Sequence, residues 1–357
     1  MTAWNRLRHD PDFARLRAVS RQLGADSLQV QGAGGNTSIK RDGAMWIKAS
    51  GTWLAEAESR DIMVPVDAEA LRAAALADDA RAEKGTAFVP EDVPAPPLRP
   101  SIETSVHAVL PAACVLHTHC VATIATALRA DAEQVVAAHL ADLGVVFIPY
   151  VKPGLALARE IHARLTPDTR GLVLGNHGLV ATGDSVAAAA ALLRRISERL
   201  AGTPRPGRPP DPALAKRLAG SAYVPAEAEA LHAVTVDPVR LAIAREGSFY
   251  PDHVIFLGPG VAVAGPDEDA EVAATRLTEA RGAAPVLLLF PGLGAALRRD
   301  ASAGAVALAQ GLGDVLARVD PEAPRQPLSA EAEAALLGWE AEAYRQSLDR
   351  RAGDTPP

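Results

Sequence analysis

The sequence predicts an α/β protein with a larger N-terminal and a smaller C-terminal domain. Segments typical of helices alternate with segments typical of strands along 357 residues, a length that exceeds one average domain. From Ala201 the chain runs Gly-Thr-Pro-Arg-Pro-Gly-Arg-Pro-Pro-Asp-Pro, and this density of proline and glycine neither continues a helix nor pairs inside a sheet. We therefore expect a first domain over residues 1–205, a linker with a connecting helix over 206–235, and a C-terminal α/β domain over 236–357.

The first domain begins with a helix over about residues 10–23 and continues into a pair of strands. The strand-like segments Ser-Ile-Lys and Met-Trp-Ile-Lys-Ala-Ser flank Asp42-Gly43. This dipeptide favours a two-residue turn, so we expect the two segments to pair as a hairpin.

The next elements of the first domain are helices. A Pro-rich loop over residues 90–100 leads to a helix start, where Ser101 offers an N-cap and Glu103 an acidic first turn. The Ala-rich segment over residues 185–200 predicts a helix with an apolar stripe, which closes the domain.

The C-terminal domain has strand-like segments over residues 253–257 and 285–290. Helices are expected near residues 301–319 and 330–348. No recognisable catalytic cluster lies in this region, and the sequence contains no repeat of fixed period. The chemistry is therefore expected in the first domain.

Composition and charge narrow the class of protein. Hydrophobic residues make up 48% and charged residues 22%, and the formal net charge is −7. Nucleic acids and anionic membranes require a basic surface, so we expect neither as a partner. The N-terminus lacks a signal-peptide apolar core and no stretch approaches the ~20 apolar residues that span a bilayer, which predicts a cytoplasmic protein. Cys114 and Cys120 are expected to be buried apolar residues in a reducing compartment.

Three histidines carry the strongest chemical signal. His117 and His119 end an apolar run, and residues two apart on a strand leave from the same face. His177, in Gly-Asn-His-Gly between two apolar segments, can add a third nitrogen from a neighbouring strand or turn. Three protein ligands and an open position are typical of catalytic zinc. We predict a site for Zn²⁺ or another divalent transition metal; any one histidine alone is more simply a hydrogen-bonded core residue.

Donor-rich turns indicate the class of substrate. The stretch from Gly32 to Ser38, Gly-Ala-Gly-Gly-Asn-Thr-Ser, allows close backbone approach and a nest of N–H groups for an anion. It lacks the lysine of a P-loop and the context of a dinucleotide fingerprint. Further polar turns over residues 48–52 and 100–103 add donors. We therefore expect a small phosphorylated or carboxylated substrate.

The ordered motifs resemble the class II aldolase/adducin family over about residues 10–200. They are Gly-Gly-Asn36-Thr-Ser, Lys-Ala-Ser50-Gly51, Pro-Ser101-Ile-Glu103, His117-Thr-His119 and Asn-His177-Gly. The sequence around these motifs, together with the later Tyr-Pro-Asp-His-Val, resembles the aldolase half of bifunctional rhamnulose-phosphate aldolase/short-chain dehydrogenase proteins. The sequence contains no segment that resembles the dehydrogenase half. The resemblance implies the family's three-layer fold with a central, mostly antiparallel sheet.

The resemblance also implies roles for the matching residues. The three histidines match the family's zinc ligands, and Glu103 matches the general base. The positions that match the substrate-binding set are Gly35, Asn36, Ser50, Gly51 and Ser101. His107, four residues after Glu103 on the same helix face, either orients Glu103 or simply packs.

Two departures from the family pattern matter. Ile102 stands where some members have a second phosphate-binding serine, so the anion site is either weaker or shaped for a carboxylate. Near His139, where some members carry a tyrosine acid, this sequence has none. Tyr150 is one alternative, and a residue of the C-terminal domain such as Tyr250 or His253 is another.

The resemblance and the metal chemistry together imply an aldolase. It would cleave or form a C–C bond of a sugar phosphate or related keto acid through a metal-stabilised enediolate, with Glu103 moving the proton and no Schiff base. A decarboxylase or 4-epimerase uses the same chemistry, and a non-catalytic adducin-like interaction domain is the third alternative. The family likeness implies a homo-oligomer, with a tetramer as one form.

Overall fold

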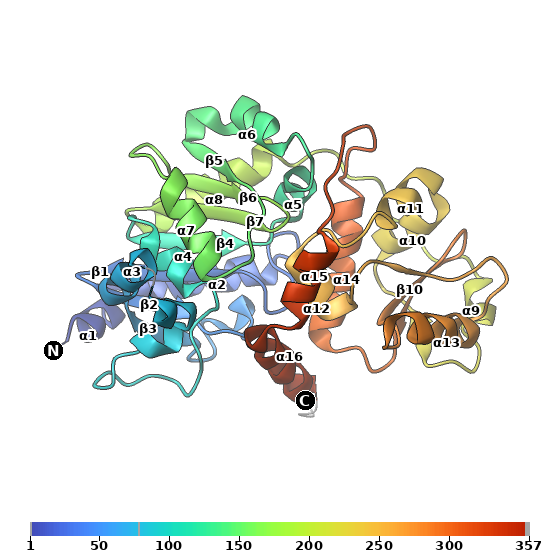
Figure 1. The fold of residues 1–357 in the computed structure, drawn as a ribbon, viewed down its shortest axis with the longest axis horizontal. Coiled ribbons are helices and arrows are strands. Elements are labelled where there is room, and N and C mark those ends of the chain that lie inside the picture. The colour runs from blue at the N-terminus through green and yellow to red at the C-terminus, as the bar shows by residue number, and fades with distance from the viewer. Residues whose placement is uncertain (1, 78, 354–357) are drawn as a thin grey trace. The chain divides into compact units, whose positions relative to one another are not determined.

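The computed structural model describes residues 2–77 and 79–353, with side chains up to Asp349. By its internal contacts the chain divides into two compact units (Figure 1). The first unit contains the chain up to Thr123 together with Asp131–Ala201, and the second contains Ile124–Ala130 and the chain from Gly202 onward. Residues 201–211 form neither helix nor strand, and we propose that the domain boundary lies there.

The first unit is built on a seven-stranded sheet in the order β3-β2-β1-β4-β7-β6-β5. Every neighbouring pair is antiparallel except β5 and β6, which are parallel. The predicted mostly antiparallel central sheet is therefore confirmed. The strands are β1 (Asn36–Arg41), β2 (Ala44–Lys48), β3 (Met63–Asp67), β4 (Cys114–Thr118), β5 (Val145–Ile148), β6 (Gly171–Leu174) and β7 (Gly178–Gly183).

Helices cover both faces of this sheet, which gives three layers. On one face lie α2 (Pro11–Ala25) and α8 (Val186–Arg199), and on the other lie α3 (Ala68–Leu76), α4 (Thr104–Val109) and α7 (Leu155–Arg164) (Figure 1). The period-two pleat sorts the residues of β1 between the faces. Thr37 bonds Ser20 of α2, whereas Ser38 bonds His107 of α4. The remaining helices of this unit are α1 (Ala3–Arg8), α5 (Val121–Ala127, shared with the second unit), α6 (Ala132–Leu140), and the short 3₁₀ turns η1 (Leu54–Glu56), η2 (Ala80–Glu83), η3 (Gly85–Phe88) and η4 (Ala141–Leu143).

The face that carries α3, α4 and α7 holds a large apolar core. Side chains from six strands, β2 to β7, meet the three helices there, and the buried members include Ile47, Val66, Val106, Val109, Val115, Leu155 and Val180. Burial of each such side chain contributes roughly 1.5–3 kcal/mol. This core packs α4, the helix that carries His107 and follows directly on Glu103, against β4. Hydrogen bonds from Ser38 and Lys40 join α4 to β1.

Most expected elements of the first unit are present. Asp42 and Gly43 form the turn between β1 and β2 with φ of 51° and 77°, as a two-residue hairpin requires. Ser185 caps α8 by accepting a hydrogen bond from the backbone N–H of Ala188. The expected N-cap at Ser101 is wrong: α4 begins at Thr104, so Glu103 occupies the cap position and the Ser101 hydroxyl accepts from its N–H.

The second unit has a smaller sheet of four strands in the order β8-β11-β10-β9. The β9–β10 pair is parallel and is joined through α13, while the other pairs are antiparallel. This confirms a smaller C-terminal α/β unit. Its elements are β8 (Tyr223–Pro225), β9 (Ala262–Val263), β10 (Leu287–Phe290), β11 (Gly294–Arg298), α9 (Leu214–Arg217), α10 (Glu229–Val236), α11 (Pro238–Ala244), α12 (Pro251–Leu257), α13 (Ala270–Arg281), α14 (Ala303–Leu316), α15 (Ala330–Leu337) and α16 (Glu340–Gly353).

Three expectations for this region need correction. The strand expected over residues 253–257 is the helix α12, because a short apolar run fits either structure and Pro251 is well placed in a first helical turn. The single helix expected over 330–348 is two helices separated at Gly338. The stretch 206–235 contributes β8 and α10 as well as connecting chain.

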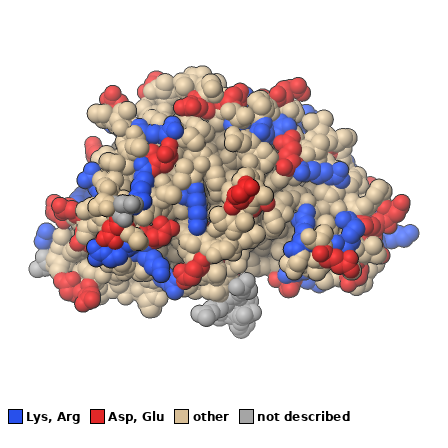
Figure 2. All heavy atoms as spheres, in the orientation of Figure 1, with Lys and Arg blue, Asp and Glu red and all other residues tan. Residues whose placement is uncertain are grey.

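No described helix has the length and apolar character to cross a membrane. On the face drawn in Figure 2, basic and acidic side chains are interspersed. Cys114 and Cys120 are both buried, and burial raises the pKa of the Cys114 thiol to about 11.

Candidate metal and substrate site

The structure brings His117, His119 and His177 together. His117 lies in β4, His119 follows just beyond its end, and His177 lies in the turn that enters β7, the strand paired with β4. Their ring centroids are 4.9 to 5.2 Å apart. One nitrogen from each ring lies within 4.8 Å of the others, and all three residues are buried. The convergence that the spacing predicted is therefore present.

A backbone contact fixes which nitrogen of His117 faces the cluster. Its Nδ1 lies 3.0 Å from the carbonyl oxygen of Leu179. Because a carbonyl only accepts, Nδ1 carries the hydrogen and a neutral ring keeps its lone pair on Nε2. Such a backbone partner is the usual way in which a protein orients a ligating histidine.

A carboxylate faces two of the three imidazoles. Oε2 of Glu103 lies 3.2 Å from Nε2 of His117, and Oε1 lies 3.6 Å from Nε2 of His177. The amide nitrogen of Asn36 donates to Oε2 at 2.8 Å. Three imidazole nitrogens beside a carboxylate form a donor set that suits zinc and related transition ions. The residues present therefore fit a divalent metal.

Glu103 is buried, yet its surroundings favour the charged form. Burial raises the pKa of a carboxyl group, but when the rings of His117 and His177 are protonated, their positive charge and the hydrogen bond from Asn36 outweigh this effect. The pKa of Glu103 consequently lies well below its ordinary value. The group is therefore a charged carboxylate at neutral pH and accepts hydrogen bonds.

Two glycines let the flanking turns approach the histidine strand. A Cβ on Gly35, where φ is 60°, would lie 2.7 Å from the carbonyl oxygen of His117. A Cβ on Gly178 would lie 2.4 Å from the carbonyl oxygen of Thr118. Both separations are shorter than a carbon–oxygen contact permits. Any side chain here would push Asn36 or His177 away from the strand.

The predicted substrate positions lie on neighbouring segments. Ala49 and Pro100 form an isolated antiparallel bridge, so the turn that carries Ser50 runs beside the one that carries Ser101. Ser101 in turn accepts from the N–H of Glu103. Gly51, at φ 75°, continues the first turn.

The hydroxyl of Ser50 stands out among these groups. It is buried and has no hydrogen-bond partner within the described part of the chain. Buried hydroxyls are normally hydrogen-bonded, so this one is available to a ligand or a water molecule.

Lys48 differs from the expectation of a donor-rich turn over residues 48–52, because it is the last residue of β2 and has a structural role. Its side chain is buried in β2, and Nζ donates to the carbonyl oxygens of Ala33 and Gly35 at 2.8 and 2.9 Å. It thereby ties the Gly-rich turn to the sheet. A lysine inside an apolar strand such as Met-Trp-Ile-Lys-Ala was the available signal, because a buried ammonium needs acceptors.

The residues considered as proton donors lie in different units. In the first unit, burial raises the pKa of Tyr150 to about 12, and its backbone nitrogen lies 2.8 Å from the Cβ that a side chain at Gly175 would add. Tyr150 thus adjoins the turn that carries His177. In the second unit, burial raises the pKa of Tyr250, and His253 contacts backbone groups of Phe249 and Gly260 through its two ring nitrogens.

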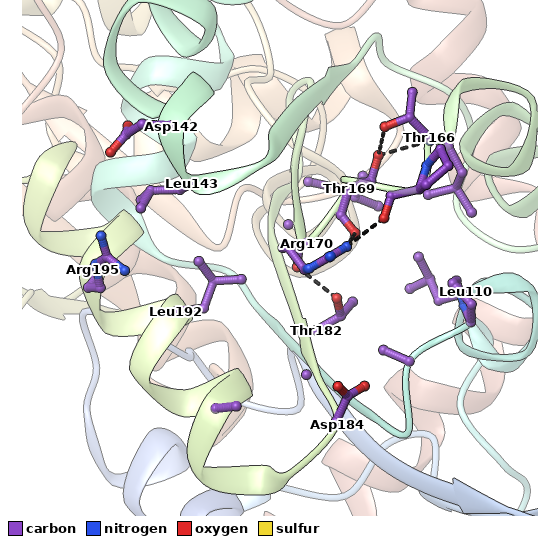
Figure 3. Close-up of a pocket in the computed structure, with 18 residues that line it drawn as sticks. Leu110, Asp142, Leu143, Thr166, Thr169, Arg170, Thr182, Asp184, Leu192 and Arg195 are labelled. Atoms are coloured by element: carbon purple, nitrogen blue, oxygen red, sulfur yellow. Dashed lines mark hydrogen bonds between the residues drawn. The ribbon is translucent and has the colours of Figure 1, made fainter.

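A separate hollow of about 560 Å³ lies at the other end of the strands of the first unit (Figure 3). It is lined where β6 begins and β7 ends, among others by Arg170, Thr182, Asp184 and Arg195. Since His177 lies where β7 begins, this hollow is remote from the histidines along the strand. Its lining includes none of the predicted site residues.

Comparison with known proteins gives a consistent result. Residues 14–201 match the model of the Class II Aldolase and Adducin N-terminal domain, which is more than half of the chain. A protein of Bacillus subtilis (strain 168) named as an uncharacterized oxidoreductase, YuxG, is 29% identical in an alignment of 180 residues that covers 46% of this chain and 26% of that protein. The chain therefore spans about a quarter of that relative's length.

Solved structures are similar to about half of the chain. The N-terminal class II aldolase domain of a conserved protein from Thermoplasma acidophilum is 27% identical, with 54% of this chain and 93% of that chain covered and a TM-score of 0.45. An l-fuculose-1-phosphate aldolase from Thermus thermophilus is 19% identical, with 53% and 91% covered and a TM-score of 0.37.

Proposed function

Because the chain belongs to the class II aldolase and adducin family, we propose that it is a zinc-dependent aldolase. It would cleave or form a C–C bond of a sugar phosphate or related keto acid. The observation that supports this most is the buried carboxylate of Glu103 beside the converging nitrogens of His117 and His177. A domain that only binds other proteins has no physical need for this arrangement.

In this proposal His117, His119 and His177 hold the metal, and Glu103 moves the proton. When bound, the divalent ion supplies positive charge that stabilises negative charge developing on substrate oxygens. In bond formation, the carboxylate of Glu103 accepts the proton from the substrate carbon that becomes the nucleophile, and the electron pair left behind makes the enediolate. In cleavage the same group returns that proton to the carbon.

The substrate anion is assigned to the turns beside Glu103. The hydroxyls of Ser50 and Ser101 and the backbone of Gly35 and Gly51 are the donors that this role requires. Ile102 replaces a hydroxyl in the same turn, so a carboxylated substrate is as consistent with these donors as a phosphorylated one. Tyr150 is the residue of the first unit that we assign to the aldehyde oxygen. In bond formation it would donate a proton to the carbonyl oxygen of the incoming aldehyde, and in cleavage it would take that proton back from the hydroxyl group.

Metal analysis joined to a substrate screen tests the proposal. The purified protein should contain about one zinc per chain and release aldehyde from a phosphorylated or acidic ketose. His119→Ala should lose both metal and turnover, whereas Glu103→Gln should keep the metal and lose ~10²–10⁴-fold in kcat, the usual worth of a positioned base. His162→Ala, at an exposed histidine of α7, is the matched control and should change neither.

Each alternative predicts a different result. Carbon dioxide or a 4-epimer as the product would identify a decarboxylase or an epimerase that uses the same residues. A protein without stoichiometric metal, together with a fully active His119→Ala variant, would contradict the proposal. The absence of metal and turnover would favour an adducin-like interaction domain. The predicted homo-oligomer is tested independently by light scattering.

A further inference from the structure

We propose that His107 is a positioning residue, which fixes the Glu103 carboxylate by orienting the amide of Asn36 between them. Its effect on turnover rests on the proposed function. The orientation itself is a property of the folded protein and is testable without a substrate. Within the described residues, the ring of His107 hydrogen-bonds side chains of β1 and none of the three site histidines, so it acts through Asn36.

Three alternate residues of β1 bind this single histidine. Oδ1 of Asn36 lies 2.5 Å from Nε2 of His107, and Oγ of Ser38 lies 2.6 Å from Nδ1. Nζ of Lys40 donates to the backbone carbonyl of His107 at 2.6 Å. Residues 36, 38 and 40 share one face of the strand because the pleat has a period of two. The strand therefore holds the ring at both nitrogens and the helix at its backbone.

The hydrogen atoms in this network have one consistent arrangement. The carboxylate of Glu103 only accepts, so the nitrogen of the Asn36 amide faces it and the amide oxygen faces His107. That oxygen only accepts, so Nε2 of His107 carries a hydrogen. In a neutral ring Nδ1 then keeps the lone pair, and the Ser38 hydroxyl donates to it.

The neutral form of His107 is favoured by its surroundings. The ring is fully buried, and burial followed by the positive charge of Lys40 lowers the pKa of His107 to about 3. The ring is thus a fixed donor at Nε2 and a fixed acceptor at Nδ1 at neutral pH.

This arrangement prevents rotation of the Asn36 amide. A flipped amide would turn its oxygen toward the Glu103 carboxylate and its N–H groups toward the N–H of His107, which replaces two hydrogen bonds by two repulsive contacts. Asn36 consequently keeps its donor on Oε2 of Glu103, the oxygen that lies 3.2 Å from His117. An apolar residue at 107 would fill the same space without this constraint.

Two substitutions at position 107 separate positioning from packing. A glutamine amide reaches about as far as Nε2 of the histidine and can donate to Asn36, whereas the shorter asparagine reaches only as far as Nδ1. We expect His107→Gln to keep kcat within about threefold of the native protein. His107→Asn should lower kcat ~10–100-fold, the usual cost of losing a partner that orients a site residue, with a small change in KM and full metal content.

A serine pair provides a matched control for buried hydroxyls. Ser38→Ala removes the donor to Nδ1 of His107, so it should relax the ring orientation and lower kcat. Ser20→Ala removes a buried hydroxyl that bonds Thr37 on the opposite face of β1. It should cost comparable stability in a denaturant titration and leave kcat unchanged.

Nitrogen NMR of the histidine side chains provides a readout that does not depend on activity. In the native protein His107 should appear as the neutral Nε2–H form with its Nδ1 unprotonated, and Ser38→Ala should perturb these signals. An Nδ1–H form would overturn the inference, as would equal kcat values for properly folded Gln and Asn variants. If both variants fail to fold, the tautomer and the response to Ser38→Ala decide alone. If the native protein turns over no substrate, the proposed function fails while these signals still test the orientation.

Discussion

Each unit contains a strand, a turn, an antiparallel strand and then a serine-capped helix, but only the turn of the first unit carries a histidine of the candidate metal site. In the first unit β6, β7 and α8 form this series, and in the second unit β10, β11 and α14 do. Ser185 and Ser302 cap the two helices with the same bond to the N–H three residues later. The turn of the first unit is Gly-Asn-His177, and that of the second is Pro-Gly-Leu293. The same strand–turn–strand–helix arrangement is thus compatible with either histidine or leucine at the last position of the turn.

The buried histidines of the two units differ in the same way. In the second unit His232 bridges the N–H of Ala295 and the carbonyl of Ala226, so both ring nitrogens serve the backbone. In the first unit His117 gives one nitrogen to the backbone and turns the other toward Glu103. Burial of a histidine therefore says little about function. Convergence of several rings on one carboxylate is the informative feature.

Exchanging the residues at the end of the two turns should have the largest effect on metal binding and turnover. His177→Leu gives the first turn the residue of the second, and it should remove a metal ligand while the apolar strands still fold. We expect loss of bound zinc and a decrease in turnover of at least ~100-fold, since changes of outer partners alone cost ~10–100-fold. Metal analysis and steady-state kinetics measure both.

The reverse exchange is the control. Leu293→His places an imidazole in the turn of the second unit, and all three predicted metal ligands belong to the first unit. It should bind no additional zinc. A His177→Leu variant with full metal content would show that this residue is not a ligand.

A cluster of buried charges in the second unit should contribute more to the free energy of unfolding than an exposed ion pair in the first unit. Arg345 bonds Asp252 at 3.0 Å and Glu342 at 2.9 Å, and all three are buried in the second unit. Arg345→Met leaves two carboxylates without their cation, so we expect a loss of about 3–5 kcal/mol in the free energy of unfolding. If these charges have only a structural role in the second unit, Arg345→Met should leave the zinc content of the protein unchanged.

The matched control for this change is an exposed ion pair. Arg60 bonds Glu56 at 2.7 Å on the surface of the first unit. Arg60→Met should cost no more than about 1 kcal/mol, because exposed pairs contribute little. Equal losses for the two variants in chemical denaturation would contradict the structural role of the buried cluster.

Much of the first unit was predictable because local patterns agree with the tertiary structure there. The Asp42-Gly43 turn, the helix after Ser185 and the same-face spacing of His117 and His119 each follow from one local rule. The position of the helix cap was not predictable, because both Ser101 and Glu103 stand near the helix start. In the structure the Ser101 hydroxyl accepts the N–H of Glu103 in a turn, and Glu103 takes the cap position.

The second unit was harder to predict for a physical reason. Residues 253–257 are apolar at every position after the histidine, and without alternation a buried helix and a buried strand have the same pattern. In the first unit the roles of His107 and Lys48 also depend on partners distant in sequence, such as Asn36 and Gly35. The residue types were visible in the sequence, but the partners that orient them were not.

The smallest expected effect compares one glycine from each unit. Gly178 enters β7 with no room for a Cβ beside Thr118, and Gly294 enters β11 where a Cβ would lie 2.7 Å from Nδ1 of His232. We expect alanine at either position to cost about 1–3 kcal/mol in urea unfolding, the usual cost of overpacking. Gly178→Ala should also weaken zinc binding, because the displaced backbone lies between His117 and His119, whereas Gly294→Ala should not. Gly202→Ala, where nothing lies within 4 Å, is the control for the substitution itself. Equal zinc affinity in the Gly178 and Gly294 variants would mean that the metal site tolerates movement of β4, the strand that carries His117. The two glycines would then differ in neither respect, and each would be required for stability only.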